Sequence, residues 1–252
     1  MKVFEVAKND RLLIGTGSSG CQPKWLKDGF YIKIPVLGYE HATEVITTKF
    51  LEQCDLRGFE YLTYHMCEVY EDGVYKGQGC YSRSFLEEGD VEVSALNIIT
   101  IAGRELSIGY NDAIELFQEH TGLFCKEYIN MILAIDAIVK NEDRHFRNIA
   151  FIRGADGTYR YAPFYDFGAG LLSDVFTHPM GEDIDHALQS VYAKPFSVFF
   201  GKDIEDFTPI SINVDGVISL CNSLKNNEYT HRAVRVLMTA LRDTEGTLWE
   251  RL

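Results

Sequence analysis

The chain has 252 residues, of which 46% are hydrophobic, and its formal net charge is −13 at pH 7. This length allows one large domain or two lobes that share a cleft. Nucleic-acid and anionic-membrane surfaces need dense Lys and Arg, so the acidic balance argues against direct nucleic-acid binding and against membrane binding.

The cysteines and the N-terminus bear on the compartment. The six cysteines are scattered without C-x-x-C spacing, which favours reduced thiols over a disulfide framework or a zinc site. Charged residues interrupt Met1–Lys8, so no signal peptide is expected, and no uncharged stretch approaches membrane-spanning length. We therefore expect a soluble cytoplasmic protein.

Residues 1–88 are predicted to form a small β-rich lobe that contains one helix. Apolar residues recur at helical spacing over Glu40–Gln53. The expected strands are Leu12–Ile14, Tyr31–Ile34, Tyr61–Glu71 and Val74–Phe85, and the last two are joined through the turn Asp72-Gly73.

A glycine-rich loop separates the first two expected strands. It reads Gly15-Thr16-Gly17-Ser18-Ser19-Gly20 and matches G-x-G-x-x-G. A dinucleotide-binding unit would continue at once into a long amphipathic helix, whereas here Pro23 and Gly29 precede another strand. Two explanations remain: a flap over the phosphates of ATP, or a simple Gly/Ser surface loop.

Lys33 lies among apolar neighbours in the second expected strand. An unpaired ammonium is costly to bury, so Lys33 should meet an anion. The candidates are an ATP phosphate and a carboxylate of the following helix, Glu44 in preference to Glu40. The alternative is a solvated position on an edge strand. Lys24 could supply a second phosphate contact.

Residues 89–252 are predicted to form a mostly helical second lobe, which makes the chain an α+β protein. The boundary is expected near Leu86–Asp90, where apolar strand residues give way to acids and glycine. Three stripes at helical spacing should be core: Phe124, Tyr128, Met131, Ile135 and Ile138; Val217, Leu220, Cys221 and Leu224; and Val234, Leu237, Met238 and Leu241.

Three polar residues of the second lobe carry the strongest functional signal. Asp143 and Asn148 have the D-x-x-x-x-N spacing of a kinase catalytic loop, and Asp166 begins a D-F-G triplet. Phosphoryl transfer needs one carboxylate that orients a hydroxyl and accepts its proton, and oxygen ligands that hold Mg²⁺ on the phosphates. ATP and Mg²⁺ are therefore the expected cofactors.

The chain between these motifs is predicted to be a tight hairpin. The runs Ile149–Arg153 and Thr158–Ala162 are joined through Asp156-Gly157, a strong turn signal. A hairpin returns the chain to its starting point. Asn148 and Asp166 should thus lie close together, as two ligands of one hard cation must.

The motifs, in their order, resemble those of HipA-like serine/threonine kinases. The resemblance runs from about Gly15 to Leu171. It implies a two-lobed fold distantly similar to protein and phosphatidylinositol kinases, with Mg-ATP as cofactor and a protein hydroxyl as acceptor. Such kinases include toxins with antitoxin partners and compact secreted kinases. It rests on Gly20-Cys21-Gln22-Pro23-Lys24, Ile32-Lys33, Tyr81 to Phe85, the segment Asn141 to Asn148, and Ala162 to Asp166.

The resemblance also implies roles for individual residues. Asp143 would be the catalytic base, Asn148 and Asp166 would bind magnesium, and Lys33 would hold the phosphates. His145 replaces the lysine that ordinary protein kinases place two residues after the base; it either donates to the transferred phosphoryl group or braces the loop.

Two further sites follow from the same resemblance. The backbone from Tyr81 to Arg83 would be the inter-lobe hinge that meets adenine. Ser18 or Ser19 would be the counterpart of a serine that some HipA-like kinases autophosphorylate in their glycine-rich loop.

Other functions fit parts of the pattern. The catalytic residues do not encode the acceptor, so a small-molecule or lipid kinase is the main rival to a protein kinase. An inactive nucleotide-binding partner protein is a second. A metal-dependent hydrolase built on Asp143, His145 and Asp166 is a third, which would leave the Lys33 strand unexplained.

Overall fold

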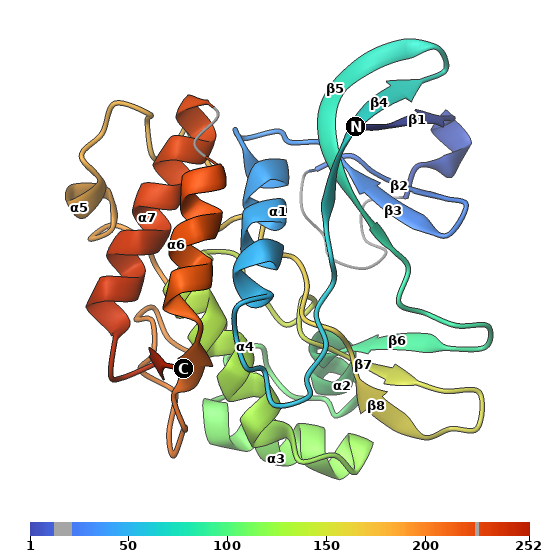
Figure 1. Cartoon of the computed structure of the whole chain (residues 1–252). Coiled ribbons are helices and arrows are strands. Elements are labelled where there is room, and N and C mark those ends of the chain that lie inside the picture. The colour runs from blue at the N-terminus through green and yellow to red at the C-terminus, as the bar shows by residue number, and fades with distance from the viewer. Residues whose placement is uncertain (13–21, 225–226) are drawn as a thin grey trace.

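The structure is a computed structural model that describes residues 1–12, 22–224 and 227–252. Its N-terminal part is a five-stranded sheet (Figure 1). β1 and β4 pair in parallel, and the other neighbours are antiparallel. In spatial order the strands are β1 (Lys2–Val6), β4 (His65–Glu71), β5 (Val74–Arg83), β3 (Phe30–Lys33) and β2 (Lys24–Lys27), and the short helix η1 (Lys8–Asp10) follows β1.

The sheet follows from alternation and turn chemistry. Along β4, Cys67, Val69 and Glu71 are buried and the residues between them are not, which is the period of a strand with one buried face. Asp72 and Gly73 both have positive φ, 51° and 78°, so the β4–β5 turn has the backbone that hairpins prefer. The hairpin predicted at this dipeptide is confirmed.

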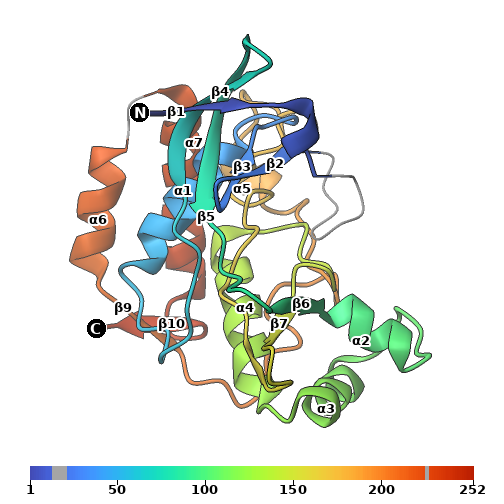
Figure 2. The same ribbon diagram turned by 90° about the vertical axis from the view of Figure 1, so that its right-hand side faces the viewer.

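Helix α1 (Glu40–Leu51) lies between the sheet and the helices of the second half (Figures 1 and 2). It contacts β4 and β5 on one side and α6 and α7 on the other. Nearly all of its residues are buried. Because the helix is enclosed, a carboxylate on it, such as Glu44, must find a partner inside the protein.

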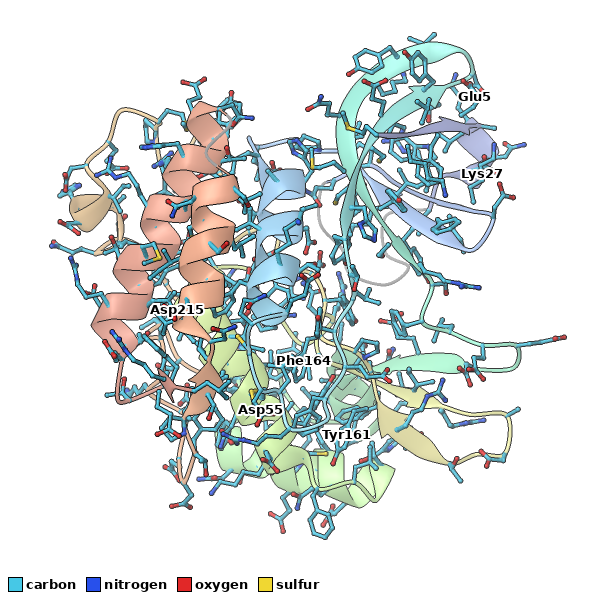
Figure 3. The ribbon with its side chains drawn as sticks, viewed as in Figure 1. Glu5, Lys27, Asp55, Tyr161, Phe164 and Asp215 are labelled. Carbon is cyan, nitrogen blue, oxygen red and sulfur yellow. The ribbon has the colours of Figure 1, made fainter. Side chains whose placement is uncertain are left out.

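The second half is mostly helical. Its central helix, α4 (Cys125–Val139), is buried from Tyr128 to Val139 and packs against α7. The ring of Tyr128 stacks on Tyr161 and Phe164, which are labelled near α4 in Figure 3. The other helices are α2 (Ala95–Ile101), α3 (Tyr110–Thr121), α5 (Ile184–Ala187), α6 (Val214–Ser223) and α7 (Glu228–Thr244).

Two small sheets complete this half. β6 (Val91–Ser94), β7 (Ala150–Arg153) and β8 (Tyr159–Tyr161) form one sheet, and β9 (Ile210–Ile212) with β10 (Trp249–Arg251) forms the other. β7 and β8 are the hairpin expected between the two catalytic motifs. The lobe boundary expected at residue 88 falls in the connection between β5 and β6, where it stays a prediction.

Several sequence expectations need correction. β4 begins at His65, not Tyr61, because Tyr61 forms an isolated bridge with Phe164 instead. Phe124 and Met238 were expected in the core but are 86% and 37% exposed, and Phe124 precedes α4 as its N-cap residue. Residues 13 and 14 of the first expected strand lie outside the described residues.

In the part of the chain that the structure describes, no helix combines the length and the apolar character needed to cross a membrane.

Candidate active site

Lys33 lies between two carboxylates that come from different parts of the chain. Its Nζ is 2.9 Å from Glu44 Oε1 on α1 and 2.6 Å from Asp166 Oδ1. Burial alone would lower the pKa of Lys33, but Asp166 and Glu44 outweigh burial and raise it well above its usual range. The ammonium is therefore charged at neutral pH, and the expected Lys33–Glu44 pair is present.

The backbone at Asp166 has an unusual conformation and is held by a hydrogen bond from the residue that follows it. Asp166 has a left-handed φ of 63°, which is unfavourable for most residues but tolerated by Asp. The next residue, Phe167, donates its N–H to Glu44 Oε2 at 3.0 Å. Glu44 thus holds Lys33 with one oxygen and the D-F-G backbone with the other.

The predicted catalytic loop, residues 141–148, is braced by a buried arginine. Arg144, 1% exposed, forms a two-pronged ion pair with Asp136 of α4 through Nε and Nη2, at 2.8 and 3.0 Å. Its Nη1 donates to the carbonyls of Asn148 and Tyr165, both at 2.8 Å. One side chain therefore joins α4, the end of the catalytic loop and the residue before Asp166.

Asn141 adds to this brace, because its Nδ2 donates to Asp136 Oδ1 at 2.8 Å. α4 ends at Val139, and Lys140 after it has a left-handed φ of 55°. This cap turns the chain sharply into the loop.

Asp143, His145 and Asn148 lie on one turn of the loop. Asn148 Nδ2 donates to the Asp143 carbonyl at 3.3 Å, and His145 Nε2 is 3.9 Å from Asp143 Oδ2. Burial lowers the pKa of His145, so its imidazole is neutral at pH 7. The Asp143 carboxylate is half exposed and is paired at 3.1 Å with Lys194, a residue that the sequence analysis missed.

Asp143, Asn148 and Asp166 line one cavity of about 200 Å³. The side-chain oxygen of Asn148 is buried there, with no hydrogen-bond partner among the described residues. An orphaned amide oxygen beside two carboxylates is a donor set that suits a hard cation such as Mg²⁺. The residues thus fit the ion that the sequence predicts.

A neighbouring cavity of about 220 Å³ suits a nucleobase. Lys24 lines both cavities, and Lys33 lines the second. The wall is mostly aromatic and aliphatic, with Ser82 and Glu92 as polar groups. Ser82 is 1% exposed, and its hydroxyl has no partner among the described residues. The other lining residues are Leu12, Tyr31, Leu62, Tyr64, Phe85 and Tyr165.

The side chains of Tyr81 and Arg83 lie outside this cavity, while the expectation that the backbone from Tyr81 to Arg83 meets adenine stays a prediction. They line a separate depression on the outer side of the sheet, where Tyr81 packs edge-on against Phe4 and Phe30. Successive strand residues point to opposite faces, so Ser82 between them faces the cavity. Gly15, Gly17, Ser18, Ser19 and Gly20 lie outside the described residues.

A larger cavity, of about 570 Å³, lies between α1, the sheet and the start of α7. It contains none of the residues predicted to bind nucleotide or metal, so its size does not make it the better candidate site.

The sheet, the enclosed helix α1 and the braced loop of residues 141–148 are parts of one fold, the two-lobed α+β fold of HipA-like kinases. The solved structures that share it include the proinflammatory kinase CtkA of Helicobacter pylori. CtkA superimposes with a TM-score of 0.60 at 15% sequence identity, over 95% of this chain and 94% of that one. The similarity shows the fold, while the roles of individual residues rest on their geometry.

A further solved structure is the toxin–antitoxin complex of HipA, HipB and operator DNA from Shewanella oneidensis MR-1. The TM-score is 0.47 at 14% identity, and the match covers 93% of this chain and 58% of that one. No family model and no curated protein matches the sequence.

Proposed function

We propose that the chain is an ATP- and Mg²⁺-dependent kinase that transfers the γ-phosphoryl group of ATP to a serine or threonine hydroxyl of a protein. The observation that carries the proposal is the convergence of Lys33, Asn148 and Asp166, from three separate segments, beside the Asp143 carboxylate. Phosphoryl transfer depends on this kind of positioning and charge placement.

Each residue has a distinct part in the proposed reaction. Lys33, kept in place by Glu44, binds the phosphates. Asn148 and Asp166 would hold Mg²⁺, which neutralises charge on the phosphates when bound. Asp143 aligns the acceptor hydroxyl and takes its proton.

Apolar side chains near Asp143 favour a protein as acceptor. Lys194, which pairs with Asp143, belongs to a segment in which Tyr192, Val198 and Phe199 are 57%, 54% and 62% exposed. These three residues lie within eight positions of the chain, and exposed apolar residues that form one patch are typical of surfaces that bind proteins. A kinase for a small polar molecule would not need them.

The test is transfer of label from γ-labelled ATP to the chain itself and to casein, with Mg²⁺. Wild type should transfer label, and Asp143→Ala and Asp166→Ala should lose at least ~100-fold of the rate. Equal rates in all three would refute the proposal. Labelling of a metabolite or lipid extract without any protein would favour the small-molecule or lipid alternative.

Autophosphorylation at Ser18 or Ser19 and control by an antitoxin or another regulatory partner belong to the same proposal. Peptide mass mapping of the wild type after incubation with Mg-ATP would locate any phosphate within residues 13–21. The inactive Asp143→Ala form is the control.

A further inference from the structure

The segment between α5 and β9 contains no helix or strand, yet it is fixed to the catalytic loop. Residues 192, 194 and 196 each contact that loop. The Tyr192 N–H lies 3.4 Å from Glu142 Oε1, Lys194 Nζ is 3.1 Å from Asp143 Oδ1, and the Phe196 ring packs edge-on against Phe146 at 5.4 Å. Long irregular segments of this kind usually serve a function.

A backbone hydrogen bond within the segment also closes it into a loop. Ala193 donates its N–H to the carbonyl of Val198 at 3.0 Å. Phe196 packs a second time, edge-on against Tyr110 of α3 at 5.3 Å. Lys194 is therefore presented to Asp143 from a backbone that is anchored on both sides of it.

The Lys194–Asp143 pair adds little to stability. Both side chains are about half exposed, at 53% and 45%, and exposed ion pairs are worth at most ~1 kcal/mol. Its effect is to place a cation against the proposed catalytic base. A carboxylate oxygen that accepts from an ammonium still has lone pairs for an acceptor hydroxyl.

The position two residues after the base does not hold a lysine or an arginine. His145 occupies it, and its Nε2 lies 3.9 Å from Asp143 Oδ2, farther than Lys194 Nζ lies from Oδ1, at 3.1 Å. Lys33 and Lys24 approach Asp166, which lines the same cavity as Asp143. Lys194 gives the acceptor side a fixed positive charge.

We propose that Lys194 is a catalytic residue whose ammonium bridges the Asp143 carboxylate and an oxygen of the γ-phosphoryl group in the transition state; this rests on the proposed kinase function. The acceptor oxygen forms a bond to the γ-phosphorus while the bond to the β,γ-bridging oxygen breaks. ADP leaves with that electron pair, and the acceptor proton passes to Asp143. The ammonium stabilises the charge on the transferring group.

The test compares Lys194→Met, Lys194→Arg and the matched control Lys202→Met, which removes an exposed lysine of the same segment. The rate of autophosphorylation is measured against ATP concentration, and thermal unfolding is measured for each variant. Lys194→Met should lower the maximal rate about 10- to 100-fold, with the half-saturating ATP concentration within about threefold of wild type. Lys194→Arg should retain most of the rate, and the control should match wild type.

Three outcomes would overturn the inference. A maximal rate for Lys194→Met equal to wild type would remove the catalytic role, and a higher rate would make the contact inhibitory. A loss shared equally by Lys194→Arg and accompanied by a lower Tm would make the lysine structural. A wild type that transfers no phosphate would instead refute the kinase function itself.

Discussion

Two carboxylates surround the Lys33 ammonium, but only one can remain its partner when a nucleotide is bound. Asp166 would turn to the metal ion and Glu44 would keep the lysine, because Glu44 is fixed by the Phe167 N–H as well. At the scale of single residues, Glu44 is thus the carboxylate that would stay paired with Lys33 in both states.

Glu44→Gln should therefore impair catalysis more than folding. The amide keeps the shape and an acceptor oxygen but loses the charge that holds Lys33. We expect the phosphotransfer rate to fall about 10- to 100-fold. The control is Glu52→Gln, at the exposed residue that follows the same helix, and its rate should match wild type. Equal rates for the two variants would remove Glu44 from the site.

Ser82 offers a test of the nucleobase cavity. Its buried hydroxyl lacks a partner among the described residues, and removing an unpaired buried polar group does not destabilise a protein. Ser82→Ala should leave Tm unchanged or higher without nucleotide, yet weaken ATP binding about fivefold, the equivalent of ~1 kcal/mol. Thermal unfolding measures the Tm and calorimetric titration measures the ATP affinity; an unchanged affinity would place the base elsewhere.

Some of these contacts between single residues could be predicted from the sequence. The Lys33–Glu44 pair followed from the cost of burying an ammonium, and the closeness of Asn148 to Asp166 followed from the hairpin. Lys194 carried no signal, because its contact with Asp143 spans residues far apart in the chain. The contact of the Tyr81 to Arg83 backbone with adenine stays a prediction, and of these three residues only Ser82 lines the cavity.

At the scale of elements, one arginine couples helix α4 to both segments that are predicted to be catalytic. Arg144 binds Asp136 within α4 and the carbonyls of Asn148 and Tyr165 outside it. Asp136 is a buried carboxylate within the mostly apolar helix α4. It neutralises a fully buried guanidinium.

Removing that arginine should disturb both stability and activity. Arg144→Met leaves Asp136 buried without its cation, which should cost ~3 kcal/mol of unfolding free energy in a denaturant titration. The double variant Arg144→Met/Asp136→Leu should recover part of this loss but none of the activity. Arg104→Met, at an exposed arginine, is the control. If Arg144→Met were as stable as this control, Arg144 would not couple α4 to the two segments.

At the scale of the whole molecule, elements that are defined by local patterns were predicted better than elements that are defined by pairing with a distant part of the chain. Both hairpins and helix α1 were expected because turns and helical spacing are local. Strand β1 was missed, since it is defined by parallel pairing with β4, far along the chain. Helices α2 and α3 were missed as well, in a stretch where no apolar stripe was identified.

The stability of the whole fold should depend on pH through two histidines. Burial lowers the pKa of both His41 and His145, so the unfolded chain binds more protons than the folded chain once pH falls below ~6.5. Their contribution is complete above that pH and is lost as pH falls toward the folded pKa values. Tm should fall from pH 7.5 to 5.5.

The double variant His41→Gln/His145→Gln should show a smaller fall in Tm over this range. The pair His186→Gln/His231→Gln, at exposed histidines, should behave as wild type. Identical pH slopes in all three proteins would show that these two buried rings do not set the acid sensitivity.

The central claim is that Asn148 and Asp166 bind one divalent ion that faces the triphosphate. Its most direct test is a titration with Mn²⁺ in the presence of a non-hydrolysable ATP analogue, with binding measured by electron paramagnetic resonance. Wild type should bind Mn²⁺ with the nucleotide, and Asp166→Asn and Asn148→Leu should each weaken that binding at least ~10-fold. Unchanged Mn²⁺ affinity in both variants would contradict the assignment.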